Sequence, residues 1–305
     1  MPIPESRLKL WAAQGSTAAA QSVCAAISYA LLTEGCSRIR DMETDLYMHG
    51  SYHNGTNLND KDPVDIAVVL TSAWSQDLAM AEASQQDLRR LKSAWQDFRL
   101  DVLGTLRGKY GLVNVEDRPG GLRIEGAADR NPVNLAVGLQ HRLYLNFGVS
   151  AGKQYQEGLS FWTPEDRQVV NFPKVHHENG EAKDGEAGVK GWFKPVVRMF
   201  KSARDYMVER EVIDASLAPS YFIECLLYNA PNTCFGWSYQ DSFAAVLKWL
   251  STAHLAGLRA QNGIEPLFGT GPTQWPDKHA RIFISTVVRA WNDWAEAAPA
   301  QQRRV

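Results

Sequence analysis

The 305-residue chain is predicted to be an α+β protein with two lobes. In its first half, the run Val64–Leu70 is rich in β-branched residues and follows a polar segment, which is typical of a buried strand. Further strands are expected at Gly121–Gly126 and Val133–Leu143. A chain of this length exceeds what one core usually supports. Helical spacing dominates the second half, with helices expected near 192–210, 219–229, 239–259 and 277–296.

Two helices and one loop complete the predicted organisation. The alanine-rich segment Glu5–Thr33 has apolar residues at helical spacing, and Ser75–Lys109 has an apolar stripe with charges between. The polar, glycine-containing run 176–190 predicts a mobile loop. We therefore expect a core at 1–175 and a helical lobe at 191–305.

Several side chains of the second half have structural explanations. Trp291 and Trp294 are three residues apart on one predicted helix, so we expect both in the core. Cys225 is also expected there. The adjacent His176 and His177 lack a partner at a fixed metal-binding spacing, which favours a solvated loop.

Composition excludes some classes of protein. A net charge of −2 gives no general attraction to polyanions, so a protein that coats nucleic acid is not expected. No apolar run is long enough for a membrane span, and the N-terminus lacks a signal-peptide pattern. We expect a cytoplasmic protein with no membrane partner. Four cysteines with neither zinc-ribbon nor secreted spacing are expected to be free: Cys24, Cys36, Cys225 and Cys234.

The segment Tyr47–Leu70 carries the main indication of function. Gly50 permits a turn in which backbone N–H groups, including that of Ser51, can approach a phosphate closely. Asp65 lies inside the predicted strand, and a carboxylate is costly to bury unless it is paired or bound to metal. We therefore expect Asp65 to point into a polar cleft near this turn.

This segment resembles the signature hG[GS]…[DE]h[DE]h of the polymerase-β nucleotidyltransferase superfamily. It is most similar to the CD-NTases of the DncV-like, SMODS type, which are bacterial relatives of cyclic GMP-AMP synthase. The resemblance implies a mixed sheet flanked by helices, a first helix that spans both lobes, and a helical lobe like that of oligoadenylate synthase. It covers nearly the whole chain, continuing through 121–126, 130–137, 171–180, 193–201 and 218–228.

The resemblance also implies three metal-binding acids, and two of them are substituted. When Asp65 is aligned with the second acid, Pro63 stands in the first position. When Asp65 is aligned with the first, Ala67 stands in the second. The third acid falls on Asn134 in both alignments. Two-metal transfer requires carboxylates that hold the ions against mutual repulsion, whereas Asn offers a neutral oxygen and Pro no side-chain ligand.

Three other acids are candidate replacements. Asp62 would enter the cleft if the start of the strand were kinked, and Asp60 lies in the same loop. Glu125 points away from its apolar neighbours on a predicted strand. For Asp60 and Asp62 we favour solvated loop acids, and for Glu125 a surface or ion-paired position.

Three residues of the helical lobe match nucleotide-binding positions of the family. Lys201 lies on a basic face of the predicted helix Trp192–Arg210, and Ser220 and Tyr221 begin the next helix. The resemblance implies that Lys201 and Ser220 contact a triphosphate and that Tyr221 stacks on a base. The alternatives are a solvated basic face, an N-cap and a core aromatic.

Two functions follow from these observations. One is an active synthase that uses Mg²⁺ or Mn²⁺, held by Asp65 with Asp62 or Glu125, to join nucleoside triphosphates into a cyclic or linear signal. In the family such signals activate an effector in antiphage defence. The other is a degenerate relative that binds nucleoside triphosphates with weak or lost synthesis, or that serves as a non-catalytic partner in a defence complex. The substituted acids favour the second.

Overall fold

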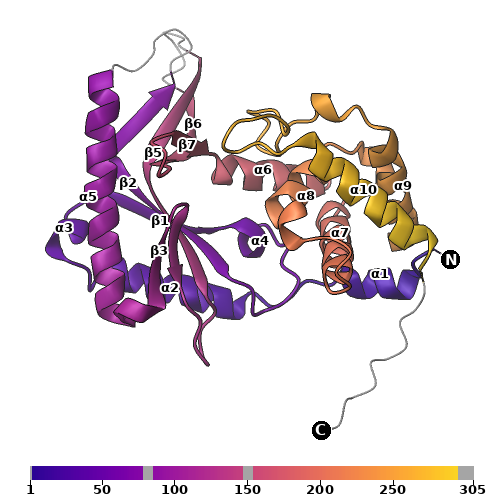
Figure 1. Ribbon diagram of the computed structural model, residues 1–305, viewed down its shortest axis with the longest axis horizontal. Coiled ribbons are helices and arrows are strands. Elements are labelled where there is room, and N and C mark those ends of the chain that lie inside the picture. Colours follow the sequence, from indigo (N-terminus) through magenta and orange to yellow (C-terminus); the bar gives the residue numbers. More distant parts are fainter. Residues whose placement is uncertain (1, 78–84, 147–153, 295–305) are drawn as a thin grey trace.

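The computed structural model describes residues 2–77, 85–146 and 154–294. These residues form two lobes that lie side by side, a sheet lobe and a helical lobe (Figure 1). Hydrophobic residues gather into one large core in each lobe. The two-lobed α+β architecture expected from the sequence is confirmed.

One mixed sheet forms the centre of the sheet lobe. Strands β1, β2, β5, β4 and β3 lie side by side in that order, and β6 pairs with both β5 and β7. The pair β2–β5 is parallel and the other pairs are antiparallel. The bounds are β1 Thr44–His49, β2 Val64–Asp77, β3 Val115–Arg118, β4 Gly121–Ile124, β5 Val133–Asn146, β6 Gln154–Trp162 and β7 Gln168–Asn171.

Two helices, α2 (Ala18–Leu32) and α5 (Gln85–Tyr110), pack against one face of this sheet. The sequence predicted a helix from Ser75, but β2 continues through this residue, which pairs with His141 of β5. Part of the predicted helix start, 78–84, lies outside the described residues. The short helix α3 (Ser37–Arg40) precedes β1.

The N-terminal helical segment spans both lobes as two helices rather than one. Helix α1 (Glu5–Trp11) packs into the core of the helical lobe, whereas α2 belongs to the sheet lobe. Between α1 and α2 the chain passes Gly15, where a Cβ atom would overlap the backbone of Asn59. Asn57 donates a hydrogen bond to the carbonyl oxygen of Gly15, which fixes this crossing.

The prediction of a loop at 176–190 was wrong for 176–184, because helix α6 covers Pro173–Asp184, whereas residues 185–190 form a bend and turns. Three residues of this helix are buried: Val175, His176 and Gly180. Buried His176 has its Nε2 atom 2.9 Å from a carboxylate oxygen of Glu224, and Gly180 packs closely against Gln261. Polar side chains that are buried through hydrogen bonds carry no hydrophobic periodicity, so the sequence pattern did not reveal this helix.

The helical lobe is built from α1, α6, α7 (Phe193–Val208), α8 (Ser220–Tyr228), α9 (Tyr239–Thr252) and α10 (Asp277–Asn292). Phe243 stacks on Trp291 in its core, and Trp294 packs edge-on against Trp11. Cys225 is fully buried there. These core positions were predicted from the sequence.

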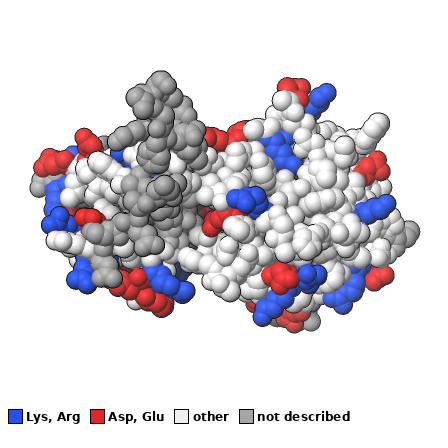
Figure 2. All heavy atoms as spheres, turned by 90° about the horizontal axis from the view of Figure 1, so that it is seen from above, with Lys and Arg blue, Asp and Glu red and all other residues white. Residues whose placement is uncertain are grey.

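The surface and the cysteines also match the composition. Lys and Arg side chains are interspersed with Asp and Glu on the face shown in Figure 2, without a large area of one sign. All four cysteines are free. Among the helices of the described ranges, none is both long and apolar enough to cross a bilayer.

Candidate nucleotide site between the lobes

A cavity of about 460 Å³ lies between the two lobes. The residues that border it include Asp62 and Pro63, which precede strand β2. A second cavity, of about 800 Å³, shares His49, Asp65, Asn134 and Tyr221 with the first. The first cavity brings together most of the site residues selected from the sequence: Gly50, Ser51, Asp65, Asn134, Lys201, Ser220 and Tyr221.

The Gly-Ser turn lies directly against Asp65. Gly50 begins the short helix α4 (Gly50–His53) with a φ of 66°, a conformation that favours glycine. A Cβ atom at this position would overlap Oδ2 of Asp65. Backbone pairing of His49 with Asp65 across β1 and β2 sets this close approach. The turn therefore needs glycine for both its conformation and its space.

Asp65 belongs to a chain of hydrogen bonds and not to a cluster of carboxylates. Asp65 and Asn134 are register partners on the parallel strands β2 and β5. Nδ2 of Asn134 donates to Oδ1 of Asp65 over 2.9 Å, and Nη1 of Arg123 donates to Oδ1 of Asn134 over 2.9 Å. The position expected for the third acid thus presents an N–H group to Asp65.

The remaining candidate acids do not complete a metal site. Asp62 borders the cavity, but its carboxylate accepts a hydrogen bond from Asn59 over 2.9 Å. Glu125 is half exposed, pairs with Arg123 and Arg118, and borders neither cavity. Asp60 is exposed. Within the residues that the structure describes, no group of three His, Cys, Asp or Glu side chains is placed to bind a metal ion.

Both alignments of the acid pair leave a position without a ligand. Ala67 shares a sheet face with Asp65 and is fully buried in a small apolar cluster with Val69 and Leu159. Pro63 lies at the cavity, just before β2 begins. The residues present therefore do not fit a two-metal centre, because Asp65 is the one carboxylate at the expected positions.

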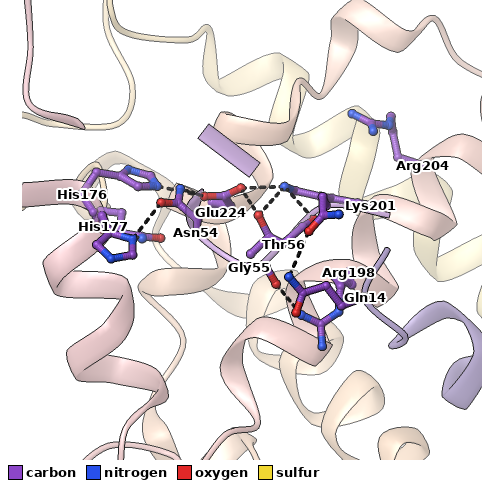
Figure 3. A network of polar contacts seen from close by, with 12 residues as sticks. Gln14, Asn54, Gly55, Thr56, His176, His177, Arg198, Lys201, Arg204 and Glu224 are labelled. Atoms are coloured by element: carbon purple, nitrogen blue, oxygen red, sulfur yellow. Dashed lines mark hydrogen bonds and ion pairs between the residues drawn. The ribbon is translucent and has the colours of Figure 1, made fainter. Parts of the chain in front are cut away.

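Lys201 lies in a buried network between the lobes (Figure 3). Its side chain is 1% exposed and pairs with Glu224 of α8, with Nζ 2.6 Å from Oε1. Nζ also donates to Oγ1 of Thr56 over 2.9 Å and to the carbonyl oxygen of Thr56 over 3.3 Å. An ammonium group has three donors, and all three are used here.

The other carboxylate oxygen of Glu224 extends the network. It accepts hydrogen bonds from Nδ2 of Asn54 over 2.8 Å and is 2.9 Å from Nε2 of His176. Lys201 and His176 hold the pKa of Glu224 well below its ordinary value despite burial, and burial lowers the pKa of Lys201. Because Asn54 and Thr56 follow α4, the network joins the sheet lobe to three helices of the other lobe.

Tyr221 borders both cavities with a ring that is already stacked. His176 lies against it with ring centroids 4.8 Å apart, and Trp275 lies 5.4 Å away on a tilted plane. Burial raises the pKa of Tyr221 far above its ordinary value, so its hydroxyl stays protonated.

Sequence reasoning missed Glu224, Trp275 and Arg204. Glu224 is the one acid in the otherwise apolar helix segment YFIECLLY. A single acid among apolar residues indicates a buried carboxylate that needs a partner, and this signal was available in the sequence. Arg204 follows Lys201 by three residues on α7 and borders the same cavity. The spacing of three residues alone indicates that the side chains of Lys201 and Arg204 share a face of the helix.

Comparisons with known proteins match this architecture. Residues 178–292 match the family model described as the cGAS/DncV-like nucleotidyltransferase C-terminal helical domain. The chain is 37% identical over 301 residues to the cyclic UMP-AMP synthase of Rhodothermus marinus, covering 97% of this chain and 100% of that protein. The chain belongs to the CD-NTases.

Further similarities support the same family. The cyclic nucleotide synthase CdnE01 of Staphylococcus haemolyticus is 29% identical over 96% of this CD-NTase and 100% of that relative. The structure of the R. marinus CdnE c-UMP-AMP synthase with Apcpp and Upnpp matches with a TM-score of 0.84, over 98% of this chain and 99% of that one. The Elizabethkingia meningoseptica CdnE structure, 21% identical with a TM-score of 0.70 over 96% of this chain and 100% of that one, shares the fold.

Removing Lys201 is expected to destabilise this CD-NTase, since Glu224 would stay buried without its partner. Breaking one side of a buried ion pair costs about 3–5 kcal/mol, so Lys201→Ala should lower the free energy of unfolding by about that much. Lys201→Met combined with Glu224→Gln removes both charges and should cost less. Urea unfolding measures both, with the exposed Lys278→Ala as control. Equal losses in the single and double variants would contradict the interpretation of Lys201 as the partner of a buried charge.

A histidine pair at the lobe boundary is expected to make stability depend on pH. His53 of α4 and His177 of α6 lie against each other with ring centroids 3.9 Å apart and planes tilted by 31°. Burial first, then His177 and His49, lower the pKa of His53 from 6.5 to about 4; Glu181 opposes this and Lys194 adds to it. Burial also lowers the pKa of His177. Below pH 6.5 the unfolded chain therefore binds protons that the folded chain does not.

Stability should accordingly fall as the pH drops from 6.5 towards about 4. Urea midpoints at about pH 7 and about pH 5 measure this dependence. Replacing both residues in a His53→Asn, His177→Asn variant should flatten it. An unchanged slope in that variant would show that other groups titrate instead.

Proposed function

We propose that this CD-NTase binds nucleoside triphosphates in the cavity between its lobes and that its metal-dependent synthesis of cyclic or linear oligonucleotides is weak or lost. One observation carries the second half of this proposal. At the third acid position, Asn134 directs an N–H group at Asp65, where a metal-binding site requires a second negatively charged oxygen.

Nucleotide binding is supported by what borders the two cavities. The Gly50 turn and the start of α8 at Ser220 face the smaller cavity from opposite lobes, and both ends offer backbone N–H groups suited to phosphate. The larger cavity adjoins it at Asp65, which suits two nucleotides that meet there. The R. marinus relative has been solved with two nucleotide analogues.

Mg²⁺ or Mn²⁺ is the cofactor that the family implies, and its chemistry depends on charge. Loss of even an outer partner of a metal ligand typically costs about 10–100-fold in metal affinity or activity. Loss of two carboxylates that bind the metal directly should cost more. We therefore infer that Asp65 alone does not sustain efficient turnover.

An active synthase is the second candidate, and the position of Asp62 is the observation that favours it. Asp62 borders the same cavity as Asp65, and its hydrogen bond to Asn59 would need to be exchanged for a metal contact. Glu125 gives no such support, because it is paired at the surface. In either case, the family resemblance supports a role in antiphage defence, through an effector or as a partner in a defence complex.

Restoring the acids is expected to restore synthesis. Asn134→Asp with Ala67→Asp, and separately Asn134→Asp with Pro63→Asp, rebuild the two alternative acid pairs. Labelled nucleoside triphosphates with Mg²⁺ or Mn²⁺ should give products with one of these variants and little product with the natural chain. Thermal unfolding should accompany each assay, because a carboxylate at position 67 enters an apolar cluster.

Two outcomes decide between the candidates. Adding Asp65→Asn to the productive variant should abolish its products, since the acid pair is then broken. Robust synthesis by the natural chain that disappears in Asp65→Ala would overturn the proposal and establish an active synthase. Products that disappear in Asp62→Asn would place the missing ligand at that residue.

A further inference from the structure

We propose that the cavity binds its triphosphate without a divalent cation and that the guanidinium of Arg204 contacts the phosphates. This inference rests on the proposed function, because it concerns how the same cavity holds its ligand. It follows from the charges at the two ends of the cavity. At the end formed by Asp65 and Asn134, one carboxylate stands where a metal site needs several. At the other end, Lys201 is already paired with Glu224.

The acid end is already satisfied without a metal ion. Asn134 donates to the carboxylate of Asp65, and Arg123 donates to the amide oxygen of Asn134. Arg123 fixes the amide with its N–H group towards Asp65, because a guanidinium donates and does not accept. A metal ion would have to displace this hydrogen bond and would meet one carboxylate instead of several.

The lysine end supplies no free charge. Lys201 and Glu224 form a buried pair whose charges cancel, and each of the three ammonium donors has an acceptor. Moving Nζ to a phosphate would leave Glu224 buried with His176 as its remaining ionisable partner. Because breaking a buried pair is costly, we expect Lys201 to stay where it is.

Arg204 is the cation that remains available at this end. It borders the cavity together with Ser220, and in Figure 3 it stands apart from the Lys201 network. Nε donates to Asp205 over 2.6 Å and Nη1 donates to the carbonyl oxygen of Ala218 over 2.9 Å. These two contacts hold the guanidinium plane, and no hydrogen bond is found for Nη2 within the described part of the chain.

A held guanidinium suits phosphate recognition. Arg presents a rigid planar set of donors that matches phosphate oxygens, and little side-chain freedom is lost when the group is already oriented. Asp205 offsets part of the charge, but its side chain is 46% exposed and its field is therefore screened by water. The position three residues after Lys201 places Arg204 on the same side of α7.

The test measures binding and does not depend on activity. Calorimetric titration with non-hydrolysable ATP and UTP analogues is performed on the full chain, once with EDTA and once with Mg²⁺. The dissociation constants should agree within about threefold, a difference below 1 kcal/mol. In one of the two acid-restored variants, Asn134→Asp with Ala67→Asp or with Pro63→Asp, Mg²⁺ should tighten binding by about tenfold or more, which shows that the assay detects a metal-dependent site.

Substitution tests the cation. Arg204→Gln should weaken binding by about tenfold or more in EDTA, as expected for a charge-assisted hydrogen bond. Arg210→Gln is the matched control, because Arg210 lies just after the same helix, contacts Tyr206 and borders neither cavity. It should bind like the natural chain. Thermal unfolding of both variants verifies that they are folded.

Each outcome separates this inference from the proposed function. Binding by the natural chain that requires Mg²⁺, or that tightens about tenfold with it, overturns metal-free binding and leaves nucleotide binding intact. Equal affinities of Arg204→Gln and Arg210→Gln overturn the assignment of Arg204. Absence of binding with both EDTA and Mg²⁺ removes the proposed function itself.

Discussion

The buried ion pair between Lys201 and Glu224 is the interaction on which the candidate site depends. Neither charge tolerates burial alone, so each fixes the other, and Thr56 and Asn54 tie the pair to the sheet lobe. The lobes meet through hydrogen bonds that have a defined direction and length, which apolar contacts lack. Four residues of this network, Asn54, Thr56, Lys201 and Glu224, also border the smaller cavity.

The same pair separates structure from ligand binding. From the sequence, Lys201 was expected to contact a triphosphate. In the structure it is buried and paired with Glu224, so its charge stabilises the fold. Under the proposed function, the positive charge that faces a bound triphosphate then comes from other groups. Among the described residues that border the smaller cavity, we propose that the start of α8, the Gly50 turn and the guanidinium of Arg204, which also pairs with the half-exposed Asp205, supply it.

Much of the fold was predictable because apolar residues define it. The run Val64–Leu70 and the stripe of α7 have strong periodicity, and the structure confirms both. The helix α6 and the partner of Lys201 were not predicted, because buried polar groups such as His176 and Glu224 are recognised by their partners, far away in sequence. The register of Asp65 and Asn134 likewise required the sheet, although their pairing followed the expected motif.

The substituted acid positions show why the fold can persist without a metal ion. Asn134 has nearly the shape of an aspartate, and both ends of its amide have partners. Ala67 fits an apolar cluster in which an unpaired carboxylate would be desolvated, and Pro63 precedes the strand, where no ladder hydrogen bond is lost. Each position is thus stable with no ion to neutralise. The sheet that borders the cavity is therefore satisfied without metal ligands at these positions, which is consistent with the proposal that nucleotide binding persists where metal-dependent synthesis is weak or lost.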